Sequence, residues 1–190
     1  MRKHVYPSIM LTALLTALLG LVYPFAITGV AQILFPWQAN GSLIVENGHV
    51  VGSTLIGQPF ADPKYFWGRL SATSPQAYNA ASSSGSNLAP TNQALLDAVK
   101  QRVADLRAAD PGTTAPIPVD LVTSSGSGLD PHISPAAALY QVPRVARVRG
   151  LSVDTVRALV QRHTLGRQFR ILGEPRVNVL ELNRDLDQPK

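Results

Sequence analysis

An uncharged apolar stretch near the N-terminus constrains the fold of this chain more than any other feature. Residues 5–45 contain no Asp, Glu, Lys or Arg, and Leu, Ala, Ile, Val and Phe dominate from Ile9 to Phe35. As a helix rising about 1.5 Å per residue, that run would be roughly 40 Å long, which exceeds the hydrocarbon core of a bilayer. The stretch therefore predicts a transmembrane helix over residues 9–36.

The charges on either side of this stretch predict its orientation. Arg2 and Lys3 precede it, whereas the first cation after it is Lys64. Because short cytoplasmic segments carry the excess of Lys and Arg, residues 1–8 are expected in the cytoplasm. Residues 37–190 are then expected to form an extracytoplasmic domain. This arrangement is that of a single-pass protein of a cytoplasmic membrane.

A cleaved signal peptide is the alternative interpretation of the apolar stretch. Gly29-Val30-Ala31 offers small residues for a cleavage site. However, the apolar core of a signal peptide normally has about 7–15 residues, which is much shorter than this run. We therefore favour a retained anchor, and either interpretation puts the folded domain outside the cytoplasm.

Small residues and a proline recur at every fourth position of the span. Small side chains allow another helix to approach closely within lipid, so this stripe predicts a partner helix in the membrane. A chance spacing is the alternative, since Ala, Thr and Gly are common in membrane spans. The residues of the stripe are Thr12, Thr16, Gly20, Pro24 and Thr28.

The rest of the chain predicts one α+β domain, because helix and strand signals are mixed along it. Asn47-Gly48 favours a tight hairpin turn, and Thr91 or Asn92 can cap a helix. Pro143 is expected to kink or divide a later helix. The expected elements are a hairpin of residues 42–46 and 49–56, a loop over 71–92, helices over 93–109, from 134 and from 152, and strands over 119–123 and 176–183.

Two of the three expected helices show an apolar face for burial. In the first, Leu95, Leu96, Val99, Val103 and Leu106 form an apolar side opposite Lys100, Arg102 and Arg107. In the helix from Ser152, the core-facing residues are expected to be Val153, Val156, Leu159 and Val160.

Arginine is concentrated in one part of a chain whose formal net charge is +5. Between Arg144 and Arg176 there are eight arginines against only Asp154 and Glu174. We expect a solvated helix face, or contact with lipid headgroups or an acidic subunit. Nucleic acid is not expected as a partner, because that partner is scarce outside the cell.

Searches for catalytic patterns give little. No Gly-Lys pair occurs, which excludes a phosphate-binding loop of the Walker type, and the chain has no cysteine. The four histidines are too scattered to suggest a metal site. A membrane-tethered serine hydrolase using Ser127, Asp130 and His132 is an alternative, although the glycines around Ser127 do not form a nucleophile elbow.

Several motifs in a fixed order resemble those of one family, the C subunits of the Kdp-type potassium-transporting ATPase of bacteria. Trp67 and Ala89 are modest departures from the usual forms of these motifs. In chain order the motifs are Gly57-Gln58-Pro59-Phe60, Tyr65 to Ala72, Gly85 to Asn92, Asp120 to Thr123, Ser125 to Ser134 and Gly173 to Asn183.

The resemblance implies a four-subunit complex of the bacterial cytoplasmic (inner) membrane that uses ATP hydrolysis to import potassium with high affinity. In such a membrane the expected extracytoplasmic domain would be periplasmic. In that family a channel-like subunit selects K⁺, a P-type subunit hydrolyses ATP with Mg²⁺, and a very small subunit stabilises the assembly. This chain contains neither an Asp-Lys-Thr-Gly phosphorylation motif nor a carbonyl filter loop. We therefore expect an accessory, non-catalytic subunit that itself binds no cofactor.

The resemblance also implies a catalytic chaperone that raises the affinity of the pump subunit for ATP. Because ATP is cytoplasmic, the predicted topology opposes direct contact with it. An independent extracytoplasmic binding module is a further alternative. The motif positions whose role is open are Asn87, Thr91, Asn92, Ser125, Gly126, Ser127, Gly128, Asp130 and Pro131.

Overall fold

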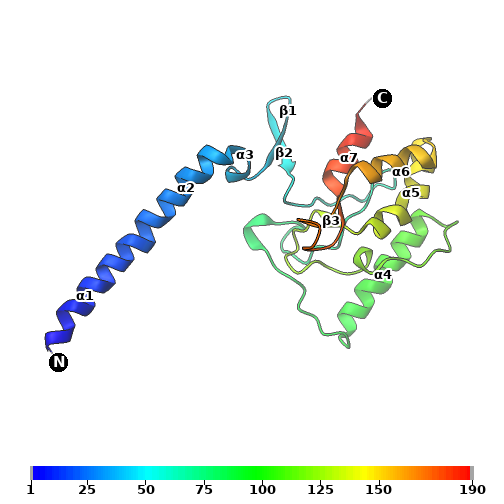
Figure 1. Cartoon of the computed structure of the whole chain (residues 1–190). Coiled ribbons are helices and arrows are strands. Elements are labelled where there is room, and N and C mark those ends of the chain that lie inside the picture. Colours follow the sequence, from blue (N-terminus) through cyan, green and yellow to red (C-terminus); the bar gives the residue numbers. More distant parts are fainter. Residues whose placement is uncertain (1, 189–190) are drawn as a thin grey trace. The chain divides into compact units, whose positions relative to one another are not determined.

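Figure 1 shows the computed structural model of the chain, which describes residues 2–188. The predicted N-terminal segment begins at Met1 and the predicted domain ends at Lys190; Met1, Pro189 and Lys190 lie outside the described residues. The structure consists of two units, of which the first ends at Ser53 and the second begins at Thr54. Mixed helices and strands behind one apolar helix confirm the expected α+β class.

A long helix forms most of the first unit. It comprises α1 (Arg2–Ala17), a π-helical turn (Leu18–Val22) and α2 (Tyr23–Leu34), followed by the short helix α3 (Pro36–Ala39). Residues Lys3–Leu34 reach a mean hydropathy of 2.0 and are long and apolar enough to cross a membrane. None of the residues Lys3–Leu34 is buried.

The π-helical turn has a chemical cause in Pro24. Proline has no amide hydrogen to donate to the Gly20 carbonyl, and its ring crowds that carbonyl. The helix widens instead, and Tyr23 N donates to Leu18 O, five residues back. The helix therefore continues past the proline.

The predicted hairpin follows the helix, as β1 (Leu43–Glu46) and β2 (His49–Ser53). Asn47 and Gly48 have φ angles of 50° and 79°, which a tight turn of this kind requires. The second strand ends at Ser53 rather than at Ile56. Val45 and Val50 pair across the hairpin and are exposed, so this two-stranded sheet has little apolar cover of its own.

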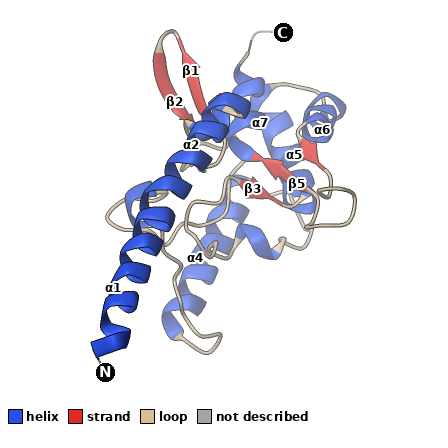
Figure 2. Ribbon diagram, turned by 60° about the vertical axis from the view of Figure 1, so that its left-hand side comes forward, coloured by secondary structure: helices blue, strands red, loops and turns tan. Residues whose placement is uncertain are grey.

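The second unit is built around a small antiparallel sheet with the strand order β3-β5-β4 (Figure 2). Its strands are β3 (His132–Ile133), β4 (Thr164–Leu165) and β5 (Arg176–Asn178). Helix α6 (Val153–Arg162) packs against α5 (Pro135–Arg149) and α7 (Val179–Asp187), and both α5 and α7 contact β5. The core that they enclose includes Phe66, Trp67, Leu121, Ile133, Val142, Val145, Val156, Leu159, Val160, Val177 and Leu182.

Local capping chemistry explains where the helices begin. Helix α4 (Gln93–Ala109) starts at Asn92, whose side chain accepts a hydrogen bond from Ala94 N at 2.9 Å. The hydroxyls of Ser134 and Ser152 cap α5 and α6 in the same way. Helix α5 runs through Pro143 as one helix, so of the two expected outcomes, a kink or a division, the division does not occur.

The two later strand predictions need correction. Residues 119–123 form a short 3₁₀ turn, Val119–Leu121, rather than a strand. Of residues 176–183 only Arg176–Asn178 are extended, because the Asn178 side chain then caps helix α7 by accepting from Glu181 N at 3.2 Å. Leu182 and Leu186 lie on the buried side of that helix.

Three details of the predicted helix faces also differ. Leu96 is 42% exposed and Val153 is 40% exposed, rather than buried. Arg102 was expected to face solvent, but its guanidinium donates to the carbonyls of Leu121 at 3.0 Å and Gly68 at 3.1 Å. Burial lowers the pKa of Arg102. The predicted loop over 71–92 is confirmed, with one 3₁₀ turn at Ala80–Ser82.

Candidate functional site

Two loops that carry some of the motif residues of the second unit pack against each other. We call residues 70–85 and 124–130 together the two-loop clasp. Ser125 N donates to Leu70 O at 3.1 Å, and Ser84 N donates to Ser127 O at 3.0 Å. The Ser71 hydroxyl donates to Gly128 O at 2.7 Å. The loops are therefore held by backbone carbonyls, which explains why small residues suffice there.

Glycine is required in the clasp where the loops approach most closely. Gly128 is buried and has a φ of +69°. A Cβ atom on Gly128 would lie 2.6 Å from the Ser84 carbonyl oxygen, and one on Gly85 would lie 2.9 Å from the Gly126 carbonyl oxygen. Gly126 is exposed and a Cβ atom there would meet nothing within 4 Å. Gly85 and Gly128 thus serve packing, whereas Gly126 faces outward.

The arrangement around Ser127 does not assemble a hydrolase triad. Its hydroxyl oxygen accepts a hydrogen bond from Leu129 N at 3.1 Å, a turn within the loop itself. Asp130 accepts from His132 N at 2.9 Å and lies 3.2 Å from His132 Nδ1. Within residues 2–188 no hydrogen bond joins Ser127 to His132. The acid and the imidazole are together, but the nucleophile is engaged elsewhere.

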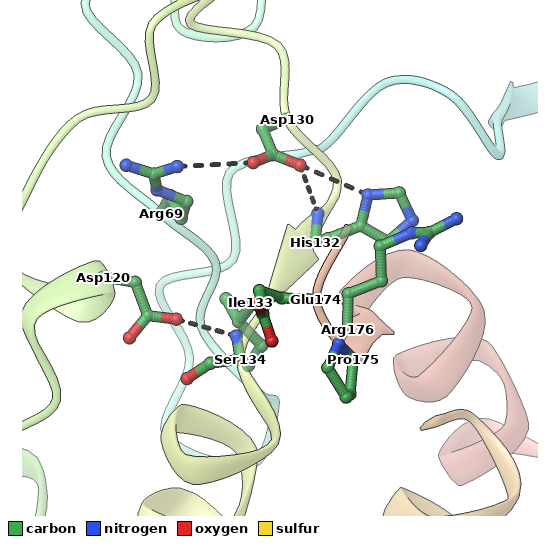
Figure 3. Close-up of a pocket in the computed structure, with 9 residues that line it drawn as sticks. All are labelled: Arg69, Asp120, Asp130, His132, Ile133, Ser134, Glu174, Pro175 and Arg176. Carbon is green, nitrogen blue, oxygen red and sulfur yellow. Dashed lines mark hydrogen bonds and ion pairs between the residues drawn. The ribbon is translucent and has the colours of Figure 1, made fainter. Parts of the chain in front are cut away.

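Asp130 and His132 line a surface cavity of about 270 Å³ beside the clasp (Figure 3). Arg69 approaches Asp130 at 3.4 Å, and Asp120 accepts a hydrogen bond from Ser134 N at 2.7 Å. Burial alone would raise the pKa of Asp130, but hydrogen bonds from His132 and the nearby charge of Arg69 outweigh it, so the pKa lies below its usual value. The remaining lining residues are Ile133, Glu174, Pro175 and Arg176.

The cavity combines carboxylates and cations, and the acids are engaged by partners on the chain. Among residues 2–188 no group of three or more His, Asp or Glu side chains could hold a metal ion. Glu174 is paired with Arg167 at 2.7 Å. The acids that line the cavity are therefore already paired within the chain.

The other predicted site residues lie outside this cavity. Asn87 adopts a positive φ of 51°, Thr91 is exposed, and Asn92 caps α4. Pro131 accepts a hydrogen bond from Val179 N at 2.9 Å, which ties the clasp to the start of α7. The stripe of Thr12, Thr16, Gly20, Pro24 and Thr28 belongs to the first unit and is exposed throughout. The motif positions therefore do not converge on one site.

Two amide side chains that sequence reasoning missed hold the Phe66-Trp67 segment. Asn183 accepts from Phe66 N at 2.8 Å and donates to Phe66 O at 2.9 Å. Gln141 accepts from Trp67 N at 2.8 Å and donates to Trp67 O at 3.0 Å. The two amide side chains thus make the backbone hydrogen bonds that a neighbouring strand would make in a sheet. Asn183 ends a family motif, and that position was the only available signal.

A cation stack beside this segment was also missed. The guanidinium groups of Arg102 and Arg144 lie 4.9 and 4.8 Å from the centroid of the Trp67 ring. Arg144 also donates to Gln141 Oε1 at 2.6 Å and to the carbonyl of Pro63. Burial lowers the pKa of Arg144 to about 10. Its side chain is only 2% exposed, so it belongs to the core and not to a solvated face.

The remaining arginines correct the expectation of one solvated basic face. Carboxylates from other parts of the chain neutralise several of them: Arg147 pairs with Asp110, Arg149 with Asp187 and Arg162 with Asp185, all within 2.9 Å. The sequence-based count considered only the acidic residues between positions 144 and 176, and these three partners lie outside that range. Among residues 2–188, the guanidinium groups of Arg170 and Arg176 have no hydrogen-bond or ion-pair partner.

Comparison with known proteins gives one consistent result. The family model described as "K+-transporting ATPase, c chain" matches residues 5–188. The chain is 64% identical to a protein of Methylococcus capsulatus and 63% identical to one of Variovorax paradoxus, each over 187 residues and 98% of this chain. These matches cover 98% and 97% of the two relatives, and each relative is named "Potassium-transporting ATPase KdpC subunit". The chain therefore belongs to the KdpC family, the C subunits of the potassium-transporting ATPase.

Proposed function

We propose that the chain assists assembly of the ATP-driven, high-affinity potassium-uptake complex and carries out no catalytic step itself. Family membership carries this proposal, since relatives that match over their full length are named as subunits of this ATPase. The structure supports it in a second way. The motif residues of the second unit are engaged in packing and capping, not gathered at a reactive centre.

The membrane helix is the proposed docking element. Thr12, Thr16 and Gly20 leave room for close approach of another helix, and no side chain of the apolar span is buried within the chain. The channel-like, potassium-selecting subunit is the proposed neighbour. The P-type subunit and the very small subunit complete the proposed assembly, together with membrane lipid.

Enlarging the small residues tests helix docking. Thr16→Leu combined with Gly20→Leu should reduce recovery of the other subunits after mild solubilisation. Leu14→Phe is the matched control, because Leu14 lies about 200° round the helix from Thr12 and is exposed. If the other subunits are recovered as well with the double variant as with Leu14→Phe, docking through this stripe is refuted.

The proposed topology has the N-terminus in the cytoplasm and the α+β domain in the periplasm. Arg2 and Lys3 before the span support it through the positive-inside rule. Protease treatment of intact spheroplasts should remove a tag fused at the C-terminus. Protection of that tag would reverse the topology and would make direct contact with ATP the better hypothesis.

With the domain in the periplasm, this chain could change the ATP affinity of the pump subunit only through a conformational change of that subunit. A domain outside the membrane can raise the affinity of a cytoplasmic site only by binding two states of the pump unequally. Complexes prepared with and without this chain should differ in the KM for ATP. By reciprocity, saturating ATP should change the affinity of the complex for the chain, and the absence of both effects would remove the chaperone role.

The charge pattern is compatible with a domain that covers part of the external face of the channel-like subunit. Unpaired cations would repel K⁺ over a screening length of about 8 Å at physiological salt. Pairing of Arg147, Arg149 and Arg162 with carboxylates of the same chain reduces that repulsion. The domain can therefore lie near the potassium path without a strongly positive surface.

A further inference from the structure

The loop between β4 and β5 is the most exposed apolar feature of the second unit. All ten of its residues, 166–175, are exposed. Phe169 is 79% exposed, Ile171 is 72% exposed and Leu172 is 54% exposed. Three large apolar side chains within four positions are unusual on a surface that meets only water.

The backbone fixes how this loop presents its side chains. Gln168 and Leu172 exchange two hydrogen bonds, each 2.9 Å long, and close a small hairpin. At its tip Phe169 and Arg170 have φ angles of 53° and 66°. A positive φ costs a residue with a Cβ atom about 1–2 kcal/mol. The shape of this loop therefore lowers the stability of the fold.

Charge is distributed unevenly round the same loop. Arg167 is bound by both carboxylate oxygens of Glu174 at 2.7 Å, which closes the base of the loop. Arg170, at the tip, has no ion-pair partner in the described chain from residue 2 to residue 188. The tip therefore offers apolar side chains next to one uncompensated cation.

We propose that the β4–β5 loop inserts Phe169 and Ile171 into an apolar pocket, bordered by carboxylate groups, on another subunit of the complex. This inference rests on the proposed function. Aromatic side chains and arginine are enriched where binding energy concentrates in protein interfaces. A loop that is already ordered loses little entropy on binding, which raises affinity for a pocket of fixed shape.

The fixed shape of the loop favours a protein partner over lipid. Lipid chains are fluid and accept apolar side chains in almost any arrangement, so insertion into a bilayer does not reward two strained backbone positions. A shaped protein pocket does reward them, because it binds one arrangement of Phe169 and Ile171 better than the others. The free charge of Arg170 then selects an acidic border.

Photo-crosslinking in the assembled complex tests the location of the loop. Phe169 is replaced by the photoreactive analogue benzoylphenylalanine in the full chain, and membranes are irradiated before solubilisation. The expected product joins this chain to another subunit. Val119, which is 70% exposed in the same unit, is the matched control position and should give no such product. Crosslinks from position 169 to lipid alone, to a second copy of this chain, or to nothing would overturn the proposal.

Substitutions measure the contribution of the loop to assembly. Phe169→Ser with Ile171→Ser should weaken binding of the other subunits about tenfold or more, the range expected for anchor residues. Thermal unfolding of the purified variant should match the parent, because both side chains are exposed. Unchanged binding by this variant, with normal assembly of the parent, would overturn the loop proposal alone. Failure of the parent itself to assemble would overturn the proposed function and the loop proposal together.

Discussion

Replacing Gly128 by Ala should destabilise the second unit strongly, whereas the same change at Gly126 should not. Gly128 is buried with a φ of +69°, and an added Cβ would lie 2.6 Å from the Ser84 carbonyl oxygen. The positive φ costs an Ala about 1–2 kcal/mol. Separating the loops would also weaken two hydrogen bonds, of Ser84 N to Ser127 and of Ser71 to Gly128, each worth about 1 kcal/mol.

These contributions give a loss of about 3–4 kcal/mol for Gly128→Ala. For a chain of this size, each kcal/mol lowers Tm by about 2–4 °C, so a decrease of roughly 10 °C is expected. Gly126→Ala is the matched control, because Gly126 is exposed and a Cβ there meets nothing within 4 Å. Near-UV circular dichroism of the full chain in mild detergent follows the transition. Equal Tm values for both variants would refute the packing role of this motif.

Three further substitutions test the interior and its charges. Asn183→Ala should lower the free energy of unfolding by about 3 kcal/mol, because the buried N–H and C=O of Phe66 both lose their partner; urea unfolding measures it. Arg144→Met should destabilise the unit by about 2 kcal/mol, because the buried side-chain oxygen of Gln141 loses a donor and Trp67 loses a stacked cation. A variant as stable as the parent would show that desolvation of the guanidinium outweighs these contacts. The folded-state pKa of Asp130 lies below its ordinary value of about 3.9, so its stabilising contribution is complete above that pH and is lost as the pH falls through the folded pKa. The urea midpoints at pH 3 and pH 6 should therefore differ less for Asp130→Asn than for the parent. An unchanged difference would contradict the stabilising role of ionised Asp130.

Features that depend on neighbouring residues could be predicted from the sequence. The Asn47-Gly48 turn and the cap at Asn92 are local, and both occur where the pattern placed them. The end of the last strand was misplaced because Val179 and Leu182 suit strands as well as helices. What decides between the two is the side chain of Asn178, which caps α7.

The interior polar contacts could not be predicted, because their partners are far apart in the sequence. Asn183 and Phe66 are separated by 117 positions, and no period or spacing connects them. The same holds for Arg149 and Asp187, whose ion pair a local count of charges cannot reveal. Family motifs marked some of these positions as important but gave no indication that their role is packing.

The widened turn at Leu18–Val22 adjusts the rotational phase of the membrane span. In a regular α-helix residues four apart overshoot one revolution by about 40°, so a four-residue repeat from Thr12 to Thr28 would wind roughly 160° round the axis. A π turn, closed by bonds five residues back, needs more than four residues per revolution and rotates the later positions in the opposite sense. The turn thus returns Pro24 and Thr28 toward the side that carries Thr12, which keeps the proposed docking stripe closer to one side of the helix.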